Sequence, residues 1–550
     1  MDETGASADS GSRSWPTRVV PPELEERYLV EGWWDDRSLG QLLDDHLTAH
    51  GGNEFRVWSD HRPWRGTTGE VHDWARRFAR SLVDRGLQPG DVVAMQLPNC
   101  VEAAVVFWGT ALAGCVIVPI VHFYGPREVG FILGQAQPDL VVVGDCFGAL
   151  ELSAVVKSCA DQWSGRVATI ALTCPAPDLG EWLAEEPLDL PVPIDPSTPA
   201  LIAYTSGTTA DPKGVMHTHR SIGAEIRQLS GIQAPQGKPP LTGAPVGHAI
   251  GMLAGLLLPV ARNQPIHLID VWNPAAVLSA MVEADLNGGS GATFFLQSLI
   301  DHPDCGPEHL ALMGEVGLGG ASVPRSFAER AIGLGVSVSR AYGSTEHPST
   351  TGAPADLPQH RRATTDGRAM IGVELRVVDP EGADVPTGTP GEVWSRGPDL
   401  FAGYTDASAT VDSVDVDGWY HSGDIGVLDE GWLTITDRLK DIIIRGGENI
   451  SAAEVEGALL DLAGVAEVAV VAAPDSRLGE HGCVFFRMLA GEVAPTLDDV
   501  RRHLEAVGLA RQKWPEEVRV ITVFPRTASG KVRKVDLRAT LGPDDSFTTG

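Results

Sequence analysis

The sequence predicts an α/β protein in two parts. The first is a large N-terminal domain with doubly wound α/β subdomains and a small antiparallel β-barrel or sheet, and the second is a small, mobile α+β C-terminal domain. A chain of 550 residues, 43% of them hydrophobic, is long enough for more than one core. Apolar strands alternate with amphipathic helices through the first half, which is typical of a parallel sheet covered on both faces. After residue 366 glycine and proline become dense and short strands dominate, which favours antiparallel structure.

The N-terminal region carries clear start signals for helices. Residues 1–20 are rich in serine, glycine and aspartate and are predicted to form a disordered leader. Ser38 with Gln41, and Thr67 with Glu70, have the spacing of a capping box, in which the two side chains satisfy free backbone N–H groups. Helices are therefore predicted to begin after Ser38 and after Thr67.

One stretch requires a choice between a membrane span and a buried core. Ala103–Val121 is uncharged over 19 residues, which is long enough to cross a bilayer. Gly114 and Pro119 divide it, and Cys115–Val118 is rich in β-branched residues, so we predict a buried helix followed by a buried strand. Residues 1–18 lack the apolar core of a signal peptide. We therefore expect no transmembrane segment.

Charge and cysteine content exclude several classes of protein. The formal net charge is -31, and a nucleic-acid partner is not expected because phosphate backbones require a basic surface. The seven cysteines form no CxxC pair and no metal-ligand spacing, which favours a reduced, cytoplasmic protein. The sequence is compatible with a homodimer but does not decide the oligomeric state.

The second half predicts a change of architecture and then a new domain. Residues 366–437 are predicted to be a β-rich subdomain that completes an N-terminal domain spanning 21–437. Residues 441–550 alternate strand, helix, strand, strand, helix and strand, which predicts a C-terminal α+β domain of ordinary size. Ser451, with Glu454 three positions later, is predicted to cap its first helix.

The chain is organised around the stretch Tyr204–His219, which reads YTSGTTADPKGVMHTH. Glycine lets backbone N–H groups turn toward an anion, hydroxyl groups add donors, and lysine adds a positive charge, so the stretch is suited to wrap a polyphosphate. It is not a Walker A loop, because Pro212 precedes the lysine and Gly214 follows it. The predicted phosphate-binding residues are Thr205, Ser206, Gly207, Thr208, Thr209 and Lys213.

This stretch resembles the phosphate loop of the adenylate-forming superfamily, which includes acyl-CoA synthetases, luciferases and peptide-synthetase adenylation domains. The family pattern is TSGTTGxPKG, and Ala210 stands here in place of a glycine. Five further motifs match the family in order: GLGGAS at 317–322, AYGSTEHPS at 341–349, YHSGDIG at 420–426, DRLKDIIIRGGENI at 437–450 and PRTASGKVRK at 525–534. The segment Gly32–Leu43 resembles the leader of bacterial AMP-forming acyl-CoA ligases for medium-chain, alicyclic or aryl acids.

The resemblance implies a complete nucleotide site. Tyr342 would stack on adenine, as aromatic rings do on bases generally. Asp424 would accept hydrogen bonds from the ribose hydroxyls, and Arg438 would contact ribose or phosphate. The nucleotide contacts implied in this way, beyond the phosphate loop, are Gly319, Gly320, Ala321, Tyr342, Gly343, Ser344, Asp424 and Arg438.

The resemblance also implies the reacting groups. Lys531 matches the catalytic lysine of the family and Glu346 its Mg²⁺ ligand, so both would act where a carboxylate attacks the α-phosphate of ATP. Thr345 would bind the α-phosphate or the acyl carboxylate, and His248 matches the residue that closes over the carboxyl end. Surface-loop or core positions are the structural alternatives for each residue alone, and the six ordered motifs together argue against them.

The C-terminal motifs imply the second half of the reaction. Gly446 and Gly447 would line the route for the pantetheine thiol of CoA, and Lys440 occupies the family's hinge position. No carrier-protein segment with a pantetheine serine follows Lys531, which favours free CoA as the acceptor. The cofactors implied by the resemblance are ATP, Mg²⁺ and CoA.

The predicted function is an AMP-forming acyl-CoA ligase for an apolar carboxylic acid. Amino-acid-activating relatives anchor the substrate amine with an aspartate near the segment that matches Ala244–Gly251, and that segment contains no acidic residue here. A buried amine without a partner is costly, so we expect a plain carboxylic acid. Two alternatives remain open: an adenylating enzyme that loads a separate carrier protein, and a non-catalytic nucleotide-binding module. The predicted apolar lining is Met252, Leu253, Leu256, Leu257, Phe294 and Phe295.

Overall fold

The computed structural model describes residues 14–205, 212–232, 237–289, 291–320, 323, 325–446, 448–475, 477–527 and 531–541. Part of the predicted leader is held in place. The backbone N–H of Arg18 donates to the carbonyl of Ala402 at 2.6 Å, and its guanidinium donates to the carbonyl of Phe401 at 2.8 Å. The ordered chain therefore begins before residue 21.

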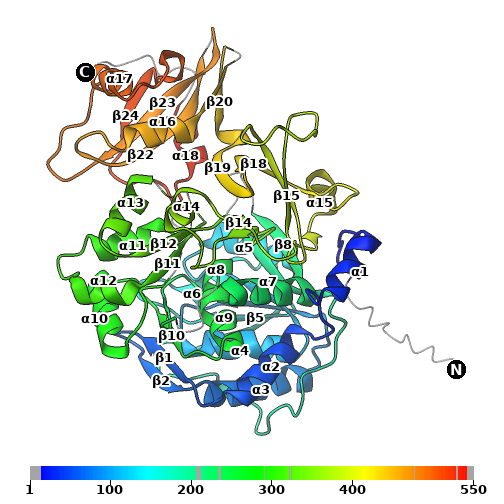
Figure 1. Ribbon diagram of the computed structural model, residues 1–550. Coiled ribbons are helices and arrows are strands. Elements are labelled where there is room, and N and C mark those ends of the chain that lie inside the picture. The colour runs from blue at the N-terminus through cyan, green and yellow to red at the C-terminus, as the bar shows by residue number, and fades with distance from the viewer. Residues whose placement is uncertain are drawn as a thin grey trace.

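A seven-stranded sheet forms the centre of the large lobe (Figure 1). Its strand order is β17 (Gly403–Tyr404), β8 (Lys213–Thr218), β7 (Pro199–Thr205), β4 (Val116–Pro119), β3 (Val92–Gln96), β5 (Leu140–Gly144) and β6 (Arg166–Ile170). The helices interspersed with these strands are α3 (Thr68–Asp84), α4 (Val101–Leu112), α5 (Pro126–Ala136), α6 (Leu152–Ser158) and α7 (His219–Ile232).

The sheet is parallel from β7 to β6, as predicted, but β8 runs antiparallel to β7. The reason is the length of the connection. A parallel pair needs a crossover of a dozen or more residues, and only the short phosphate loop joins these two strands. The loop therefore closes a hairpin, with Thr205 paired to Lys213 at its base.

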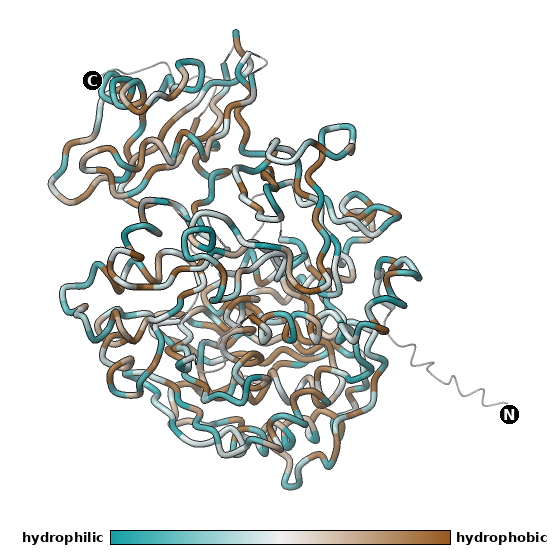
Figure 2. Tube along the Cα trace, in the orientation of Figure 1, coloured by the Kyte–Doolittle hydropathy of each residue, from teal (hydrophilic) through white to brown (hydrophobic). Residues whose placement is uncertain are grey.

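The apolar stretch Ala103–Val121 is confirmed as a buried helix followed by a buried strand. Every residue of α4 is buried, and β4 follows it after the turn at Gly114. Figure 2 shows the apolar residues gathered in the interior of the large lobe. Among the described residues, no helix combines the length and apolar character needed to cross a membrane.

The N-terminal helices and a second sheet complete this lobe. Both predicted capping boxes form, at Ser38 and at Thr67. The elements are α1 (Pro22–Val30), α2 (Leu39–Ala49), β1 (Glu54–Trp58), β2 (Trp64–Thr67), β9 (Leu241–Thr242), α8 (Ala249–Met252), a π-helical turn (Leu253–Leu257), α9 (Leu258–Ala261), β10 (Ile266–Ile269), α10 (Pro274–Ala284), α11 (Thr293–Ile300), α12 (Pro307–Met313), β11 (Glu315–Leu318), α13 (Arg325–Gly333), β12 (Ser337–Arg340) and α14 (Gln359–Thr364). The second sheet has the order β2-β1-β10-β9.

The predicted β-rich region forms a six-stranded antiparallel sheet with edges at β13 and β15. Its order is β13 (Thr351–Gly352), β14 (Arg368–Ala369), β19 (Trp432–Arg438), β18 (Tyr420–Asp429), β16 (Pro390–Arg396) and β15 (Glu374–Val378). A short helix, α15 (Ala407–Ser413), lies between β17 and β18 in the chain. The pairing of β18 with β19 sets Asp424 directly opposite Arg438.

The elements from β20 onward form a smaller lobe of their own (Figure 1). They are β20 (Ile442–Arg445), β21 (Glu448–Ser451), α16 (Ala452–Leu459), β22 (Val465–Asp475), β23 (Gly479–Met488), α17 (Leu497–Ala506), β24 (Glu517–Val520) and α18 (Lys534–Ala539). The predicted order of strands and helices is found, with β21 added after β20 and α18 added at the end. Ser451 accepts from the N–H of Glu454 and caps α16, as predicted.

One buried ion pair supports the first sheet and the loop that covers it. Glu102, in the first turn of α4, is fully buried, and the guanidinium of Arg62 donates to it at 2.5 Å. The other carboxylate oxygen accepts from the backbone N–H of Asp178 at 2.9 Å. Each carboxylate oxygen of Glu102 therefore accepts a hydrogen bond, and the positive charge of Arg62 balances its negative charge inside the protein.

Removing only the cation from this pair should strongly destabilise the large lobe. Arg62→Met leaves an uncompensated buried carboxylate, which typically costs about 3–5 kcal/mol of unfolding free energy. The double variant Arg62→Met/Glu102→Leu removes both charges and should recover most of the loss. Urea unfolding followed by tryptophan fluorescence checks both values. Equal losses in the single and double variants would contradict a charge-based explanation.

Candidate active site

A central cavity lies where the large lobe meets the small lobe, and most of the predicted site residues line it. The predicted residues in its wall are Thr205, Lys213, His248, Gly319, Gly320, Tyr342, Gly343, Ser344, Thr345, Glu346, Asp424, Arg438, Lys440 and Lys531. Six others, Ser206, Gly207, Thr208, Thr209, Ala321 and Gly447, lie outside the described residues. Gly446 is described and does not line the cavity.

Tyr342, Asp424 and Arg438 form a fixed polar wall on one side of this cavity. Asp424 is buried on β18, and the Nε of Arg438 on β19 lies 2.8 Å from one of its oxygens. The Tyr342 hydroxyl donates to the other oxygen at 2.7 Å. Burial, together with the negative charge of Asp424, raises the pKa of Tyr342, so the phenol stays protonated and donates. The carboxylate is thus oriented before any ligand arrives.

A histidine of β8 contacts the backbone of the loop that carries Thr345 and Glu346. The Nε2 of His217, on β8, lies 2.7 Å from the carbonyl oxygen of Thr345. A side chain at Gly343 is excluded, because an added Cβ would lie 1.9 Å from the carbonyl oxygen of Pro348. The glycine of this motif is therefore required by the close approach of two backbone segments.

Tyr404 connects the predicted magnesium ligand to the predicted phosphate lysine. Its hydroxyl donates to the carboxylate of Glu346 at 2.8 Å, and the Nζ of Lys213 lies 4.8 Å from its ring centroid. Sequence reasoning missed both Tyr404 and His217. His217 carried a usable signal, because it follows the phosphate loop within the same motif. Tyr404 lies in β17, far along the chain, and gave none.

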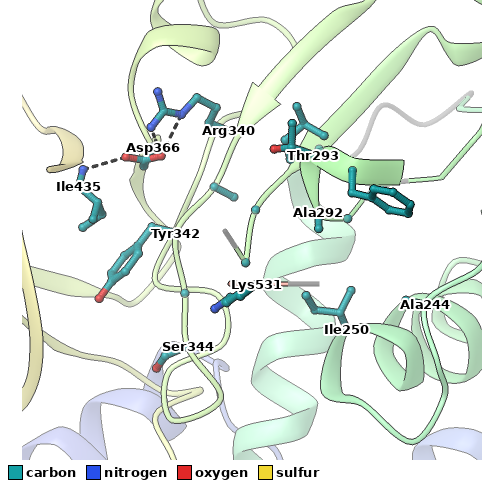
Figure 3. Close-up of a pocket in the computed structure, with 18 of the residues that line it drawn as sticks. Ala244, Ile250, Ala292, Thr293, Arg340, Tyr342, Ser344, Asp366, Ile435 and Lys531 are labelled. Atoms are coloured by element: carbon teal, nitrogen blue, oxygen red, sulfur yellow. Dashed lines mark hydrogen bonds and ion pairs between the residues drawn. The ribbon is translucent and has the colours of Figure 1, made fainter. Parts of the chain in front are cut away.

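The glycine segment beside the cavity packs closely against the first turn of α8. Gly320 has a φ of +74°, which a side chain rarely adopts, and an added Cβ would lie 3.2 Å from the Cδ1 of Ile250. Figure 3 shows Ile250 and Tyr342 on opposite sides of Lys531. A buried pair supports this region: Arg340 donates twice to Asp366, which also accepts from the N–H of Ile435 at 2.8 Å.

Lys531 carries a positive charge from the small lobe into the cavity (Figure 3). Burial lowers its pKa to about 8, with further lowering from Arg438 and Lys440 against the opposing effect of Asp424 and Glu346. Burial and the charge of Lys531 together lower the pKa of His248 to about 4, so that imidazole is neutral at pH 7. The cavity thus holds Lys531, whose pKa is lowered to about 8, together with a neutral histidine.

Lys440 lies at the boundary between the two lobes, in a 3₁₀ turn over Leu439–Asp441. Its carbonyl oxygen accepts from the guanidinium of Arg538, on α18, at 3.1 Å. The same guanidinium lies 2.5 Å from the carboxylate of Asp441. The small lobe therefore holds the C-terminal side of this turn.

Comparisons with known proteins agree with this geometry. Residues 44–405 match the model of the AMP-binding enzyme family, and residues 454–531 match the model of its C-terminal domain. This chain belongs to the AMP-binding enzyme family. It is 31% identical to the medium-chain fatty-acid–CoA ligase of Escherichia coli (strain K12), over 93% of this chain and 92% of the relative. A CoA ligase of Rhodococcus jostii (strain RHA1), named for a 7a-methyl-1,5-dioxo-octahydroindenyl propanoyl group, is 33% identical over 86% and 93%.

The structure resembles one solved enzyme more closely in its ATP-bound form than in its apo form. ATP-bound MatB from Rhodopseudomonas palustris gives a TM-score of 0.82 at 27% identity, covering 91% of this chain and 98% of the neighbour. The apo form of the same enzyme gives 0.72. The predicted superfamily, fold class and enzyme class, an acid–thiol ligase, are confirmed by these relatives. The roles of individual residues remain predictions.

The pKa of Lys531 predicts the alkaline limit of the first reaction. A lysine is charged below its pKa, so kcat/KM for ATP in pyrophosphate release should fall as the pH rises through about 8. In Lys531→Arg the guanidinium stays charged, so this decline should move to much higher pH even though activity is lower. Initial rates between pH 6 and 10 check the profile, and an unchanged decline in the arginine variant would assign it to another group.

Proposed function

We propose that the chain is an AMP-forming acyl-CoA ligase that uses ATP to activate a carboxylic acid as acyl-AMP and then transfers the acyl group to CoA. The observation that carries the proposal is the convergence of Lys531 from the small lobe with Glu346, Asp424 and Arg438 from the large lobe. In the first step a carboxylate oxygen attacks the α-phosphorus of ATP, and the bond to pyrophosphate breaks. In the second step the CoA thiol attacks the acyl carbon and AMP leaves.

Lys531 supplies the charge that the first step requires. Two anions must approach each other while negative charge develops on the pyrophosphate, and a preoriented cation lowers the free energy of that transition state. The position of Lys531 near both Asp424 and Glu346 places it between the ribose and phosphate regions of the proposed nucleotide site. His248, neutral at pH 7, can bind the acid's carboxylate end without adding charge.

The residues present fit a magnesium ion bound together with ATP. Mg²⁺ is commonly held by one or two carboxylates plus substrate phosphates, and Glu346 is a buried carboxylate in the cavity wall. Its Tyr404 partner fixes one oxygen and leaves the other available. When bound, the ion would neutralise charge on the phosphates. Among the described residues no set of three or more metal-ligating side chains forms a cage, which agrees with an ion that arrives with its substrate.

The thioester step requires the small lobe to move. Gly446 does not line the cavity here, while Lys531 does. We propose that the lobe rotates about Lys440, so that Lys531 withdraws and Gly446 with Gly447 line the approach of the CoA thiol. Hinge residues at the ends of elements, such as this 3₁₀ turn, absorb the required change of φ and ψ.

The acid is expected to have an apolar body. Apolar side chains of α8 and the helical turns after it, including Ile250, Leu253 and Leu258, line the cavity, and Phe294 closes part of it. The predicted residues Met252, Leu256 and Leu257 are instead buried behind this wall, and they do not line the cavity. Relatives are named for acids as different as medium-chain fatty acids and a dioxo bicyclic acid, so the acid has to be sought from the cavity itself.

Product analysis tests the proposal directly. Incubation with ATP, Mg²⁺, CoA and a panel of medium-chain, alicyclic and aryl acids should yield AMP, pyrophosphate and acyl-CoA, each identified by mass spectrometry. Without CoA, acyl-AMP should remain bound. Formation of ADP, or of aminoacyl products, would contradict the proposal. Acyl-AMP that reacts with a carrier protein's pantetheine and not with CoA would favour the carrier-loading alternative.

Lys531→Ala should separate the two half-reactions. Acyl-AMP formation from acid and ATP should fall by at least ~100-fold, because one well-placed electrostatic contact is typically worth that much. Supplied with synthetic acyl-AMP and CoA, the variant should still form thioester, since the lysine has left the cavity by then. Single-turnover assays of each half measure the split. Equal loss of both halves in a folded variant would make Lys531 structural.

A further inference from the structure

Glu225 lies in the wall of the central cavity on a helix that the proposed chemistry does not use. It belongs to α7, and Leu229 and Ile232 follow it at spacings of four and three, so the three side chains share one face. All three line the cavity. Across from this face lies Gly352, where an added Cβ would approach the Cδ1 of Ile232 to 3.2 Å. An added Cβ there would also lie 2.8 Å from the Sδ of Met370, so the glycine allows this part of the wall to pack closely.

The carboxyl group of Glu225 is buried without a cation among the described residues. Its residue is 2% exposed, and its described hydrogen bond is a long one of 3.4 Å from the Ser349 hydroxyl. The other buried carboxyl groups of the described chain have stronger partners. Four lie in pairs, Glu102 with Arg62, Asp366 with Arg340, Asp399 with His347 and Asp424 with Arg438, while Glu346 accepts from Tyr404 and Asp437 accepts from two backbone N–H groups. Burying a carboxyl group without a strong partner is costly, so this position is unfavourable for folding alone.

The surroundings favour the protonated form of Glu225. Burial raises its pKa well above the ordinary value, and the negative charge of Asp399 raises it further. Asp399 responds in the opposite direction. Burial alone would raise its pKa, but His347 and the amide of Gln228 outweigh that effect and the pKa is lowered. The surroundings therefore favour the anion at Asp399, which supports the loop of Thr345 and Glu346, and the neutral acid at Glu225, which lines the cavity.

A neutral carboxyl group offers one O–H donor and one carbonyl acceptor. We propose that Glu225 binds a neutral oxygen substituent, a hydroxyl or a carbonyl group, on the acyl part of the carboxylic acid. This inference rests on the proposed function and names the class of acid that the site takes. This oxygen is distinct from the reacting carboxylate, which the proposed function assigns to Lys531 and His248.

The arrangement would give the site a selectivity that an apolar wall lacks. Apolar contacts distinguish neighbouring substrates by about 10–200-fold per methylene, whereas a buried polar group left unpaired penalises an analogue without the matching oxygen far more. Leu229, Ile232 and Ala353 line the same cavity with apolar surface. Acids that carry the oxygen should be preferred over the same carbon skeleton without it.

Matched pairs of acids test the proposal. The pairs are 3-(4-hydroxyphenyl)propanoate with 3-phenylpropanoate, 3-(4-oxocyclohexyl)propanoate with 3-cyclohexylpropanoate, and 10-hydroxydecanoate with decanoate. The wild-type protein should favour the oxygenated member of at least one pair by ~100-fold or more in kcat/KM for pyrophosphate release. Glu225→Leu should remove that preference and raise kcat/KM for the unsubstituted partner. Glu225→Gln, which keeps a donor and an acceptor, should retain most of the preference.

Controls separate recognition from folding. Because the contact of Glu225 is weak, Glu225→Leu should melt no lower than wild type. The pKa of Glu225 is raised in the folded protein, so the contribution of this group to stability is fully present below the unfolded pKa of about 4.5 and is lost as the pH rises. The Glu225→Gln variant lacks this titration. Its melting temperature relative to wild type should therefore be higher at pH 7.5 than at pH 5. Glu505→Gln, on the exposed face of α17, is the matched substitution outside the cavity and should leave the acid preference unchanged.

The outcomes that overturn the proposal are distinct from failure of the proposed function. A wild-type protein that turns over acids but prefers the unsubstituted member of every pair would overturn it, as would a Glu225→Leu variant that changes both members by the same factor. A preference for dicarboxylates that Arg262→Met removes would assign recognition to that cavity-lining guanidinium instead. If no acid yields acyl-CoA, thermal shifts caused by the same pairs, in wild type and Glu225→Leu, still measure the preference as binding.

Discussion

The charge of Lys531 inside the central cavity is the feature on which the other parts of the site depend. It reaches the cavity from the small lobe, and its pKa is lowered to about 8 by burial. A partly desolvated ammonium group is stable there because Asp424 and Glu346 supply nearby negative charge. Those two carboxylates are themselves fixed, Asp424 by Tyr342 and Arg438 and Glu346 by Tyr404. The closed arrangement of the lobes is thus electrostatically matched to a reaction between anions.

Much of the fold was predictable because the local signals agree with the tertiary structure. The capping boxes at Ser38 and Thr67 form, and the uncharged stretch after Ala103 divides at Gly114 into a buried helix and strand. The antiparallel pairing of β7 with β8 was not anticipated, since strand and helix alternation favours a parallel sheet throughout. The length of the phosphate loop contained that information, because a loop so short can close only a hairpin.

The candidate site shows the same division between local and non-local information. Motifs identified many of the residues that line the cavity, because the residues of each motif are neighbours in the sequence and can be recognised together. The supports of these residues come from elsewhere in the chain: Tyr404 is 58 positions from the Glu346 carboxylate that it contacts, and His217 is 128 positions from Thr345. The apolar lining was predicted only in part, since residues such as Met252 lie on the buried face of a helical turn. Sequence reasoning looked for an acidic substrate anchor only in Ala244–Gly251, where there is none, and it did not single out Glu225 on α7. The spacing of residues in a sequence shows which side chains share a helix face, but not what that face contacts.

The boundary between the lobes limits where the proposed rotation can occur. Arg438 is held on the large-lobe side by its ion pair with Asp424 and by the pairing of β19 with β18. Asp441 is held on the small-lobe side by Arg538, which also binds the carbonyl of Lys440. Leu439 and Lys440 lie between these fixed points. Since a large rotation has to be absorbed by the dihedral angles of a few residues at the boundary, we expect the change to occur within this turn. Arg438 also lines the cavity, so the residue that anchors one side of the boundary is the one proposed to contact ribose or phosphate. A bound nucleotide would therefore act directly beside the proposed hinge.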